Sequence, residues 1–307
     1  MNPHIEEFLE DVQAANSTNT YKVRKSDLGK YEEWLQEQDI DVLEASPRNV
    51  HRYLRQASAE LSDNTVRRRI TSINLLYDFL EQWDEIDANP MAELERSDYT
   101  NTRSTKKHDK ADISYVTKEQ VEEMAANVPG PKVRNELLIR LLWQTGVRRS
   151  EAATIKLENI DRDNRSIRIW APKTQEWRTV FYQPSLDSLL RAYLDGGERA
   201  RFLTAADSEY LFVSRKVAHI RGRQVGRIVR KAASNAGIQS TLYTDAKGEE
   251  RRAVTAHSIR HGHAVHALKQ GINIKVLSKN LGHKSVDVTE QYLRLVDEDV
   301  KQEYAKF

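Results

Sequence analysis

Six side chains that could cleave a phosphodiester without a metal lie between positions 148 and 292. They are Arg148, Lys173, His257, Arg260, His283 and Tyr292. A phenol with a pKa near ~10 is a poor nucleophile at neutral pH, so Tyr292 would need neighbouring cations that stabilise its phenolate form. Arginine, lysine and histidine supply such cations, together with the hydrogen-bond donors that a transferring phosphate requires. The set predicts an enzyme that transfers DNA strands through a tyrosine.

Composition limits the other classes of protein. The chain has 307 residues, enough for two ordinary domains, and no cysteine, which excludes disulfides, thiolate zinc sites and cysteine nucleophiles. No apolar run approaches the length of a membrane span, and the N-terminal segment MNPHIEEFLEDV is acidic, unlike a basic leader. We therefore expect a soluble protein of the cytoplasm, associated with the nucleoid.

Charge is divided unevenly along the chain. Of 48 Lys+Arg and 46 Asp+Glu, residues 1–98 hold 11 and 21, a balance of −10, which leaves 37 and 25, or +12, for residues 99–307. The basic part is the one expected to contact nucleic acid most broadly. The acidic part could grip DNA only through local basic patches, and a solvated surface is the alternative for any single charge run.

The N-terminal segment has the periodicity of four amphipathic helices, which predicts a small bundle. The second helix is expected to begin near Asn19. The third has Ser46 as N-cap and Pro47 at its first position, and the fourth begins at Ser62. The apolar stripes of the first and fourth helices consist of Ile5, Phe8, Leu9 and Val12, and of Val66, Ile70, Ile73, Leu76 and Leu80.

A polar stretch separates this bundle from the rest of the chain. Residues 96–112 (RSDYTNTRSTKKHDKAD) follow Asn89-Pro90 and contain almost nothing to bury, which is typical of a linker. The expected domains are therefore residues 1–98 and 113–307, joined by residues 99–112.

The second segment mixes helices with a small sheet. It opens with a capping box at Thr117 and Gln120 and continues into an apolar helix that ends at Gly146. Residues 166–170 and 177–181 are rich in β-branched and aromatic types, and they flank a turn that contains Lys173. These features predict a short antiparallel sheet, joined by an earlier strand near Ile160, before helices resume from Pro184. The expected fold class is mainly α with this small sheet, as an N-terminal bundle and a mixed α+β domain.

Basic residues at helix starts, in the linker and along one later helix are candidates for DNA contacts. A solvated surface is the alternative for each group. The candidates are Lys22, Arg24, Lys25, Arg67, Arg68, Arg69, Lys106, Lys107, Arg223, Arg227, Arg230 and Lys231.

Four ordered motifs resemble the tyrosine recombinase (phage integrase) family, Xer-like in its compact length. They are TGVRRSEAATIKL from Thr145, the turn with Lys173, HSIRHG from His257 and LGHKSVDVTEQY ending at Tyr292. The N-terminal segment matches more loosely, by the pattern of the family's helical core-binding domain. The resemblance implies a catalytic domain of the tyrosine recombinase type at residues 113–307.

The resemblance also implies a role for each matched residue. Arg148 and Arg260 would hold the scissile phosphate by forked contacts, and Glu151 would orient the first arginine. His257 would bond a phosphate oxygen and exchange a proton with the tyrosine, whereas His283 would bond the phosphate and pack against the tyrosine. Lys173 would protonate the leaving 5′ oxygen. Here the family often has a Gly-Lys-Gly turn, and this chain has Ala-Pro-Lys.

By the same resemblance, Tyr292 would form a 3′-phosphotyrosyl link that a 5′-hydroxyl later reverses, without metal, ATP or other cofactor. Four protomers would assemble on two DNA sites and exchange C-terminal segments, here residues 293–307. Two alternatives remain open. One is a metal-dependent hydrolase built on the histidines between His257 and His283, and the other is a DNA-binding relative without catalysis.

Overall fold

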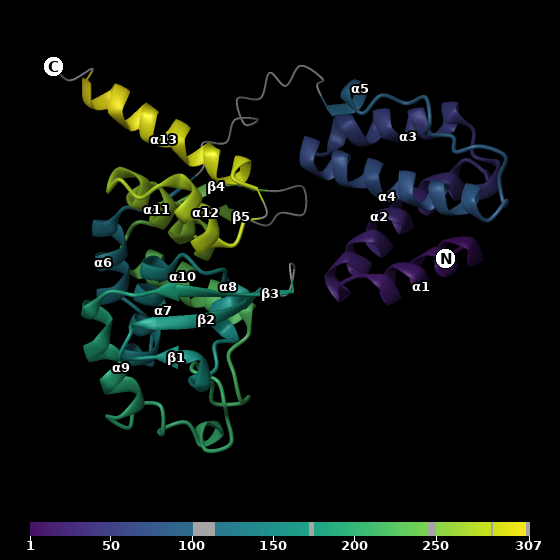
Figure 1. Cartoon of the computed structure of the whole chain (residues 1–307). Coiled ribbons are helices and arrows are strands. Elements are labelled where there is room, and N and C mark those ends of the chain that lie inside the picture. Colours follow the sequence, from purple (N-terminus) through teal and green to yellow (C-terminus); the bar gives the residue numbers. More distant parts are fainter. Residues whose placement is uncertain (101–113, 172–174, 245–249, 284, 305–307) are drawn as a thin grey trace. The chain divides into compact units, whose positions relative to one another are not determined.

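The chain forms two compact units, Met1–Lys110 and Ala111–Phe307 (Figure 1). The computed structural model describes residues 1–100, 114–171, 175–244, 250–283 and 285–304. The expected architecture is confirmed: most described residues are helical, and strands occur only in two small antiparallel sheets of the second unit's described part.

The first unit is a bundle of helices with capped N-termini. Ser17 and Ser46 accept hydrogen bonds from the first turns of their helices, and Ser46 and Asn49 form a reciprocal capping box. The second helix begins one residue before the expected Asn19. The elements are α1 (Pro3–Ala15), α2 (Thr18–Glu37), η1 (Val42–Glu44), α3 (Pro47–Glu60), α4 (Asp63–Gln82) and α5 (Ser97–Thr100).

The predicted apolar stripes of α1 and α4 form the core of this unit, since all nine of their residues are buried. Tyr31 and Tyr77 meet at its centre with their hydroxyls 2.8 Å apart. Tyr99 is also buried, and its hydroxyl lies 2.8 Å from Nδ1 of His51. The core of the first unit therefore extends into the stretch expected to be a linker, since one helical turn and an aromatic ring of that stretch belong to it.

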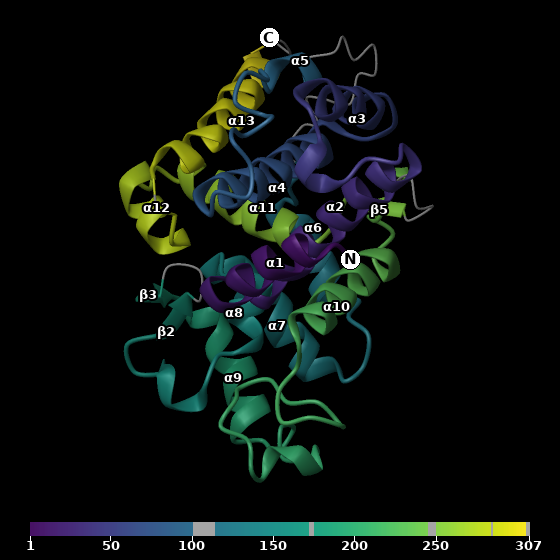
Figure 2. The same cartoon turned by 90° about the vertical axis from the view of Figure 1, so that its right-hand side faces the viewer.

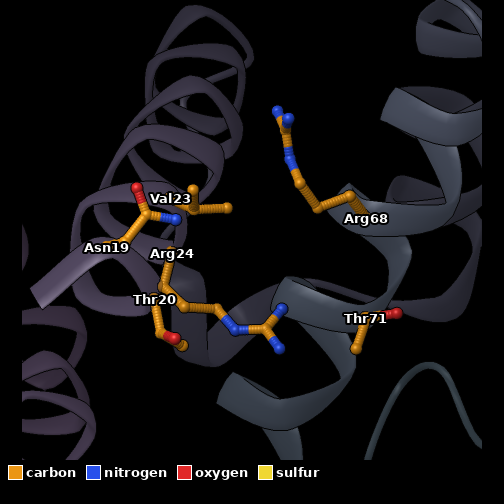
Figure 3. A pocket seen from close by; sticks show the side chains of 6 residues that line it. All are labelled: Asn19, Thr20, Val23, Arg24, Arg68 and Thr71. Atoms are coloured by element: carbon orange, nitrogen blue, oxygen red, sulfur yellow. The ribbon is translucent and has the colours of Figure 1, made fainter. Parts of the chain in front are cut away.

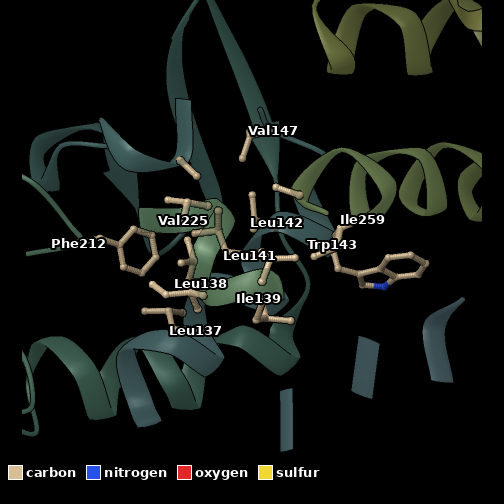
Figure 4. Packing of buried hydrophobic residues seen from close by; sticks show 14 of the residues in the cluster. Leu137, Leu138, Ile139, Leu141, Leu142, Trp143, Val147, Phe212, Val225 and Ile259 are labelled. Carbon is tan, nitrogen blue, oxygen red and sulfur yellow. The ribbon is translucent and has the colours of Figure 1, made fainter. Parts of the chain in front are cut away.

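The second unit surrounds one apolar helix, α7 (Lys132–Thr145). Its leucines pack against neighbouring helices and the sheet in a single cluster (Figure 4). The helix ends at Gly146, as expected, with φ +63°, a conformation that favours glycine. The predicted capping box of Thr117 and Gln120 opens α6 (Lys118–Ala126).

Around α7 the remaining helices follow in chain order. They are α8 (Arg149–Ala153), η2 (Leu157–Asn159), η3 (Pro184–Leu186), α9 (Asp187–Leu194), η4 (Leu203–Ala205), α10 (Gly222–Asn235), α11 (Ala256–Lys269), α12 (Ile274–Leu281) and α13 (Asp287–Tyr304). Of these, α11 contacts α7, α12 and α13, and the last three helices of the chain lie together in both views (Figures 1 and 2).

The predicted three-stranded sheet is present with the order β1-β2-β3. The strands are β1 (Ile160–Asp161), β2 (Ser166–Ala171) and β3 (Glu176–Phe181), and all neighbours are antiparallel. Trp170 pairs with Trp177, and alternate residues of β2 enter the core. A second hairpin, β4 (Thr241–Thr244) with β5 (Glu250–Arg252), was not expected from the sequence. Among the described residues, no helix combines the length and apolarity needed to cross a membrane.

Candidate active site

Three arginines from distant parts of the second unit meet at the C-terminal end of α12. Arg178 donates from Nε to the carbonyl oxygen of Asn280 at 2.8 Å, and Arg260 donates from Nη2 to that of Leu281 at 2.8 Å. Arg148 lies 3.5 Å from the same Leu281 oxygen and 3.3 Å from that of Gly282. The last carbonyls of a helix lack intrahelical partners and carry partial negative charge, so this helix end binds guanidiniums.

Glu151 is the counter-ion of this cluster. Its side chain is 2% exposed and accepts from Arg148 (Nη1, 3.1 Å) and from Arg178 (Nη1, 3.1 Å; Nη2, 2.7 Å). It also accepts from the backbone N–H of Arg148 at 2.7 Å. Burial alone would raise the pKa of Glu151, but the hydrogen bonds and charges of Arg178 and Arg148 outweigh it, and the pKa is lowered. Glu151 is therefore ionised and fixes two arginines at once.

Arg148 and Arg260 differ in their access to a ligand. The side chain of Arg148 is 37% exposed, so solvent and an anion from solvent have access to part of it. Arg260 is 2% exposed, and its other terminal nitrogen, Nη1, donates to the carbonyl oxygen of Gly146 at 2.8 Å. Burial and the charge of Arg148 lower the pKa of Arg260 to about 10, which still leaves it cationic at neutral pH. The two guanidiniums form one positive centre, with Arg148 on its outer side.

His283 lies directly against this centre. Its Nε2 is 2.9 Å from Nη2 of Arg260, and its Nδ1 is 2.8 Å from Oγ1 of Thr289. Because a guanidinium only donates, Nε2 must accept, which places the imidazole proton on Nδ1. Burial and the charges of Arg260 and Arg148 lower the pKa of His283 to about 4. The ring is neutral at physiological pH.

Tyr292 lies in the first turns of α13 and is 1% exposed. Its ring belongs to an apolar cluster with Ala264, Leu277 and Leu281, and its hydroxyl lies 2.8 Å from Nδ1 of His261. Burial raises the pKa of Tyr292, whereas the charges of Arg260 and Arg148 lower it, and burial prevails. The phenol is protonated and covered, within electrostatic reach of the arginine centre.

His257 stands at the first turn of α11 and is exposed. Its ring packs edge-on against that of His261, with centroids 4.0 Å apart. Partial burial, followed by the charges of Arg260 and Arg148, lowers the pKa of His257. A neutral imidazole is thus presented to solvent beside the buried pair of His261 and Tyr292.

The structure therefore gathers five predicted site residues in one region, namely Arg148, Glu151, His257, Arg260 and His283, with Tyr292 beside them. Lys173 lies outside the described residues. Two further residues were missed from the sequence. Arg178 lies five positions after Lys173 on β3, where a period-two pattern gave no reason to single it out. His261 directly follows Arg260 and is one of the histidines that were considered only for the metal-dependent alternative.

The metal-site alternative finds no support in the geometry. Nδ1 of His261 contacts the tyrosine hydroxyl, and His263 donates from Nδ1 to the carbonyl of Trp143 at 2.7 Å. Within the described ranges, no group of three or more His, Asp or Glu side chains could hold an ion. The histidines between His257 and His283 are used instead for packing and for the contacts of the arginine centre.

The predicted basic face of α10 is exposed. Arg223, Arg227, Arg230 and Lys231 all face solvent, while Val225, Ile228 and Val229 are buried as expected. Gly222 and Gly226 on this helix pack against Arg149 and Ser150 at the start of α8, next to the arginine centre. The basic face therefore belongs to a helix that packs beside the candidate site.

Several basic residues of the first unit reach solvent, and some of these also have partners within the unit. Lys22, Lys25 and Arg67 are exposed, and Lys25 lies 3.4 Å from the hydroxyl of Tyr21. Arg68 forms a forked ion pair with the buried Asp27, and Arg69 donates to the hydroxyl of Tyr53 at 2.9 Å. Lys106 and Lys107 lie outside the described residues.

A pocket of about 260 Å³ opens between α2 and α4 in this unit. Figure 3 shows Arg24 extending from α2 toward Thr71 of α4, and Arg68 comes from the same helix as Thr71. Arg24 donates to the hydroxyl of Ser72 at 2.8 Å, and Asn19 and Thr20 add polar groups to the lining. Two guanidiniums and several polar side chains therefore border one surface pocket.

Comparison with known proteins identifies both units. Residues 114–299 match the phage integrase family, and residues 5–83 match the N-terminal SAM-like domain of phage integrases. The chain is 35% identical over 161 residues to a probable integrase/recombinase protein of Methanocaldococcus jannaschii. That match covers 52% of this chain and 46% of the relative.

The chain is also 24% identical over 312 residues to the tyrosine recombinase XerC of Oceanobacillus iheyensis, covering 99% of this chain and 95% of the relative. A crystal structure of the XerH site-specific recombinase, bound to its palindromic difH substrate after cleavage, superposes with a TM-score of 0.72. The identity is 17%, over 98% of this chain and 83% of that one, so this likeness concerns the fold. The family match covers more than half of the sequence and includes all the gathered site residues. The chain belongs to the phage integrase family of tyrosine recombinases.

Proposed function

We propose that this protein cleaves and rejoins DNA at a specific site through a 3′-phosphotyrosyl intermediate. The observation that carries the proposal is the convergence of Arg148, Arg260 and His283 on the Leu281–Gly282 turn, with Tyr292 within their electrostatic reach. A positive centre next to a phenol suits phosphoryl transfer, and family membership supports the same reaction.

The phosphate would bind at the arginine centre. Arg148 offers exposed donors, and Glu151 with the α12 carbonyls holds its guanidinium in place. Arg260 adds positive charge from behind and would act through direct contact once His283 shifts from its Nη2. Fixed guanidiniums stabilise the extra negative charge of the pentavalent state without having to reorganise.

Proton transfer would involve groups on two sides of the phosphate. His257, neutral and exposed, is the candidate to hydrogen-bond a phosphate oxygen and to take the phenol proton. Lys173 stays the candidate for protonating the leaving 5′ oxygen, on the resemblance alone. Loss of a general acid typically slows a reaction by about 10²–10⁴-fold. No metal or other cofactor is required by this scheme.

DNA would be held by both units. In the first unit, the pocket bordered by Arg24 and Arg68 is suited to a backbone phosphate, and Lys22, Lys25 and Arg67 are exposed. In the second, the basic face of α10 would follow a phosphate row, and Lys106 and Lys107 would lie along the backbone between the units. We expect the protein to co-fractionate with the nucleoid.

Assembly would follow the pattern that the family resemblance implies, with four protomers on two DNA sites. The predicted exchanged segment, residues 293–307, begins within α13, which runs unbroken through Tyr292. Leu295 and Val296 pack against the apolar cluster of their own chain. Exchange would therefore require α13 to leave this cluster, and Tyr292 would move with it.

A nicked duplex that loses the short strand after cleavage tests the proposal. Incubation with the wild-type protein should trap a covalent complex, and mass spectrometry should find the DNA on Tyr292. Tyr292→Phe should abolish the complex, because phenylalanine keeps the ring and removes only the nucleophile. A chelator should leave the yield unchanged.

Other outcomes of the same experiment would support one of the two alternative functions. DNA bound by the wild type without any covalent product, on a duplex carrying its cognate site, would indicate a non-catalytic relative. Hydrolysis that stops in the chelator would indicate a metal-dependent enzyme, against which the described histidine contacts already speak.

A further inference from the structure

His261 is the residue that contacts the hydroxyl of the candidate nucleophile. Its Nδ1 lies 2.8 Å from the oxygen of Tyr292, and both side chains are buried, at 9% and 1% exposure. The residue expected to exchange a proton with the phenol, His257, instead packs against the His261 ring, which in turn packs against the ring of Tyr292. The three rings thus run in series from the exposed His257 to the buried Tyr292.

The ring of Tyr292 is enclosed by apolar side chains, and we call this buried position of the ring its seat. Ala264 and Val265 of α11, with Leu277 and Leu281 of α12, complete an apolar cluster around its ring. A hydroxyl in such a place costs about 1–3 kcal/mol if it has no hydrogen-bond partner. The contact with His261 removes that cost, so the imidazole makes an otherwise unfavourable position of the phenol stable.

We propose that His261 is a positioning residue that holds Tyr292 in a resting seat, inaccessible to DNA, until α13 moves. The proposal rests on the proposed function, because a resting seat has meaning only for a tyrosine that later attacks. Attack itself requires the phenol oxygen to contact a phosphate of bound DNA, and in this position the side chain of Tyr292 is only 1% exposed.

A role as the proton acceptor suits His261 poorly. Burial, with the charges of His257 and Arg260, lowers the pKa of His261 to about 3, and burial raises that of Tyr292 above its usual range. Efficient general bases have pKa values near the working pH, so transfer from this phenol to this imidazole is strongly uphill. The contact is therefore suited to holding the phenol and not to activating it.

Nitration of the DNA-free protein tests the seat. Tetranitromethane modifies accessible tyrosines, and peptide mass spectrometry separates Tyr292 from the other eleven of the twelve tyrosines. His261→Phe keeps a ring of similar size and removes the hydrogen bond, so the nitration rate of Tyr292 should rise by about 10-fold, as expected for about 1.4 kcal/mol. His261→Asn, whose amide nitrogen or oxygen can replace Nδ1, should restore slow nitration.

Two controls separate release of the seat from general damage. His266→Phe makes the same substitution on the same helix, where the ring packs against Trp143, and should leave Tyr292 protected. Tyr193 is fully buried in the main core of the same unit and should stay unmodified in every variant. Nitration of Tyr193 would report unfolding of the His261→Phe variant. The nitration rate of Tyr292 would then be compared between His261→Asn and His261→Gln. The amide of glutamine is displaced from the Nδ1 position, so nitration should be faster in His261→Gln.

The result that overturns the proposal is unchanged nitration of Tyr292 in a folded variant that lacks the hydrogen bond. A fall of about 10²-fold or more in covalent-complex formation, with nitration unchanged, would likewise overturn it and make His261 a proton-transfer group. Failure of the function itself is distinguishable, because the wild-type protein would then form no covalent complex with DNA, whatever the nitration pattern.

Discussion

The ion pair of Glu151 with Arg178 is much less exposed to solvent than the pair of Arg162 with Asp195. With Arg178 the pair is nearly buried, at 2% and 10% exposure, and Arg178 also holds the carbonyl of Asn280. By contrast, the pair of Arg162 and Asp195 is open to solvent, at 39% and 55%. Solvent screens the second pair and not the first, so the two differ in what their loss should cost.

Arg178→Met should lower the free energy of unfolding by roughly 3 kcal/mol, because a buried carboxylate loses one of its two cations. The substitution should also loosen Arg148 and slow DNA cleavage. Chemical denaturation of the second unit measures the stability. Arg162→Met is the matched control, with an expected change below about 1 kcal/mol. Equal losses of unfolding free energy in the two variants would mean that burial does not make the pair of Arg178 and Glu151 more important for stability than a surface pair.

Acid should destabilise the second unit through its buried imidazoles. Burial is the main cause that lowers the pKa of His261 to about 3 and of His263 and His283 to about 4, from 6.5. The unfolded chain then binds more protons than the folded one below pH 6.5, so stability is fully present above that pH. It is lost as pH falls from 6.5 toward about 4.

Calorimetric melting between about pH 7.5 and about pH 5 measures this loss as a falling Tm of the second unit. His263→Asn should flatten the dependence, because asparagine can still donate to the carbonyl of Trp143 from the position of Nδ1 and does not titrate. A Tm that is constant over this range would show that these imidazoles have the same pKa in the folded protein as in the unfolded chain.

At the scale of elements, α11 is the helix on which the site is built. It carries His257, Arg260 and His261 on successive turns and packs against α7, α12 and α13. It approaches the segment before α6 and the helix α7 very closely, since a Cβ on Gly262 would lie 2.0 Å from the carbonyl oxygen of Val116 and 2.9 Å from the Trp143 ring. Glycine is needed here for space and not for its backbone freedom.

Gly262→Ala should therefore lower the free energy of unfolding by at least about 3 kcal/mol, because backbone atoms must move to admit the methyl group. Denaturation followed by circular dichroism measures it. Gly29→Ala in α2 is the control. There the added Cβ meets only ordinary contact, with Met1 at 3.6 Å, and alanine should stabilise the helix by roughly 0.5–1 kcal/mol. A mild effect at Gly262 would show that α11 can shift away from Val116.

For the whole molecule, the net charge of +2 conceals opposite balances in residues 1–98 and residues 99–307. DNA binding would thus depend on individual basic side chains at the interface more than on the net charge of the protein. The slope of log affinity against log salt should then be proportional to the number of phosphates contacted. In the part of the second unit that the structure describes, the predicted contacts lie together on the exposed face of α10.

Arg227→Gln should weaken DNA binding to cognate and unrelated duplexes alike. It should also reduce the slope of log affinity against log salt by about 0.9. Fluorescence anisotropy across a salt series measures both quantities. Arg201→Gln removes an exposed charge outside the predicted interface and should change neither. A change confined to one DNA sequence would instead mean that Arg227 reads a base.

Much of the fold follows from local patterns in the sequence. Ser46-Pro47, the Thr117–Gln120 box and Gly146 mark helix ends through short-range hydrogen bonds and backbone preferences, and the structure confirms all three. The expected core residues of α1 and α4 are buried for the same local reason, the period of a helix. Tyr99 was misjudged because its partner, His51, is 48 residues away.

The family could likewise be read from motif order, which also named the candidate reactive side chains. Their arrangement could not. Arg148 meets the Leu281 carbonyl across 133 positions of the chain, and Arg178 meets Asn280 across 102. Whether Tyr292 faces solvent or a covered seat against His261 depends on how α13 packs over α11 and α12. Contacts at such separations come from the packing of whole elements, which no spacing within a single helix or strand encodes.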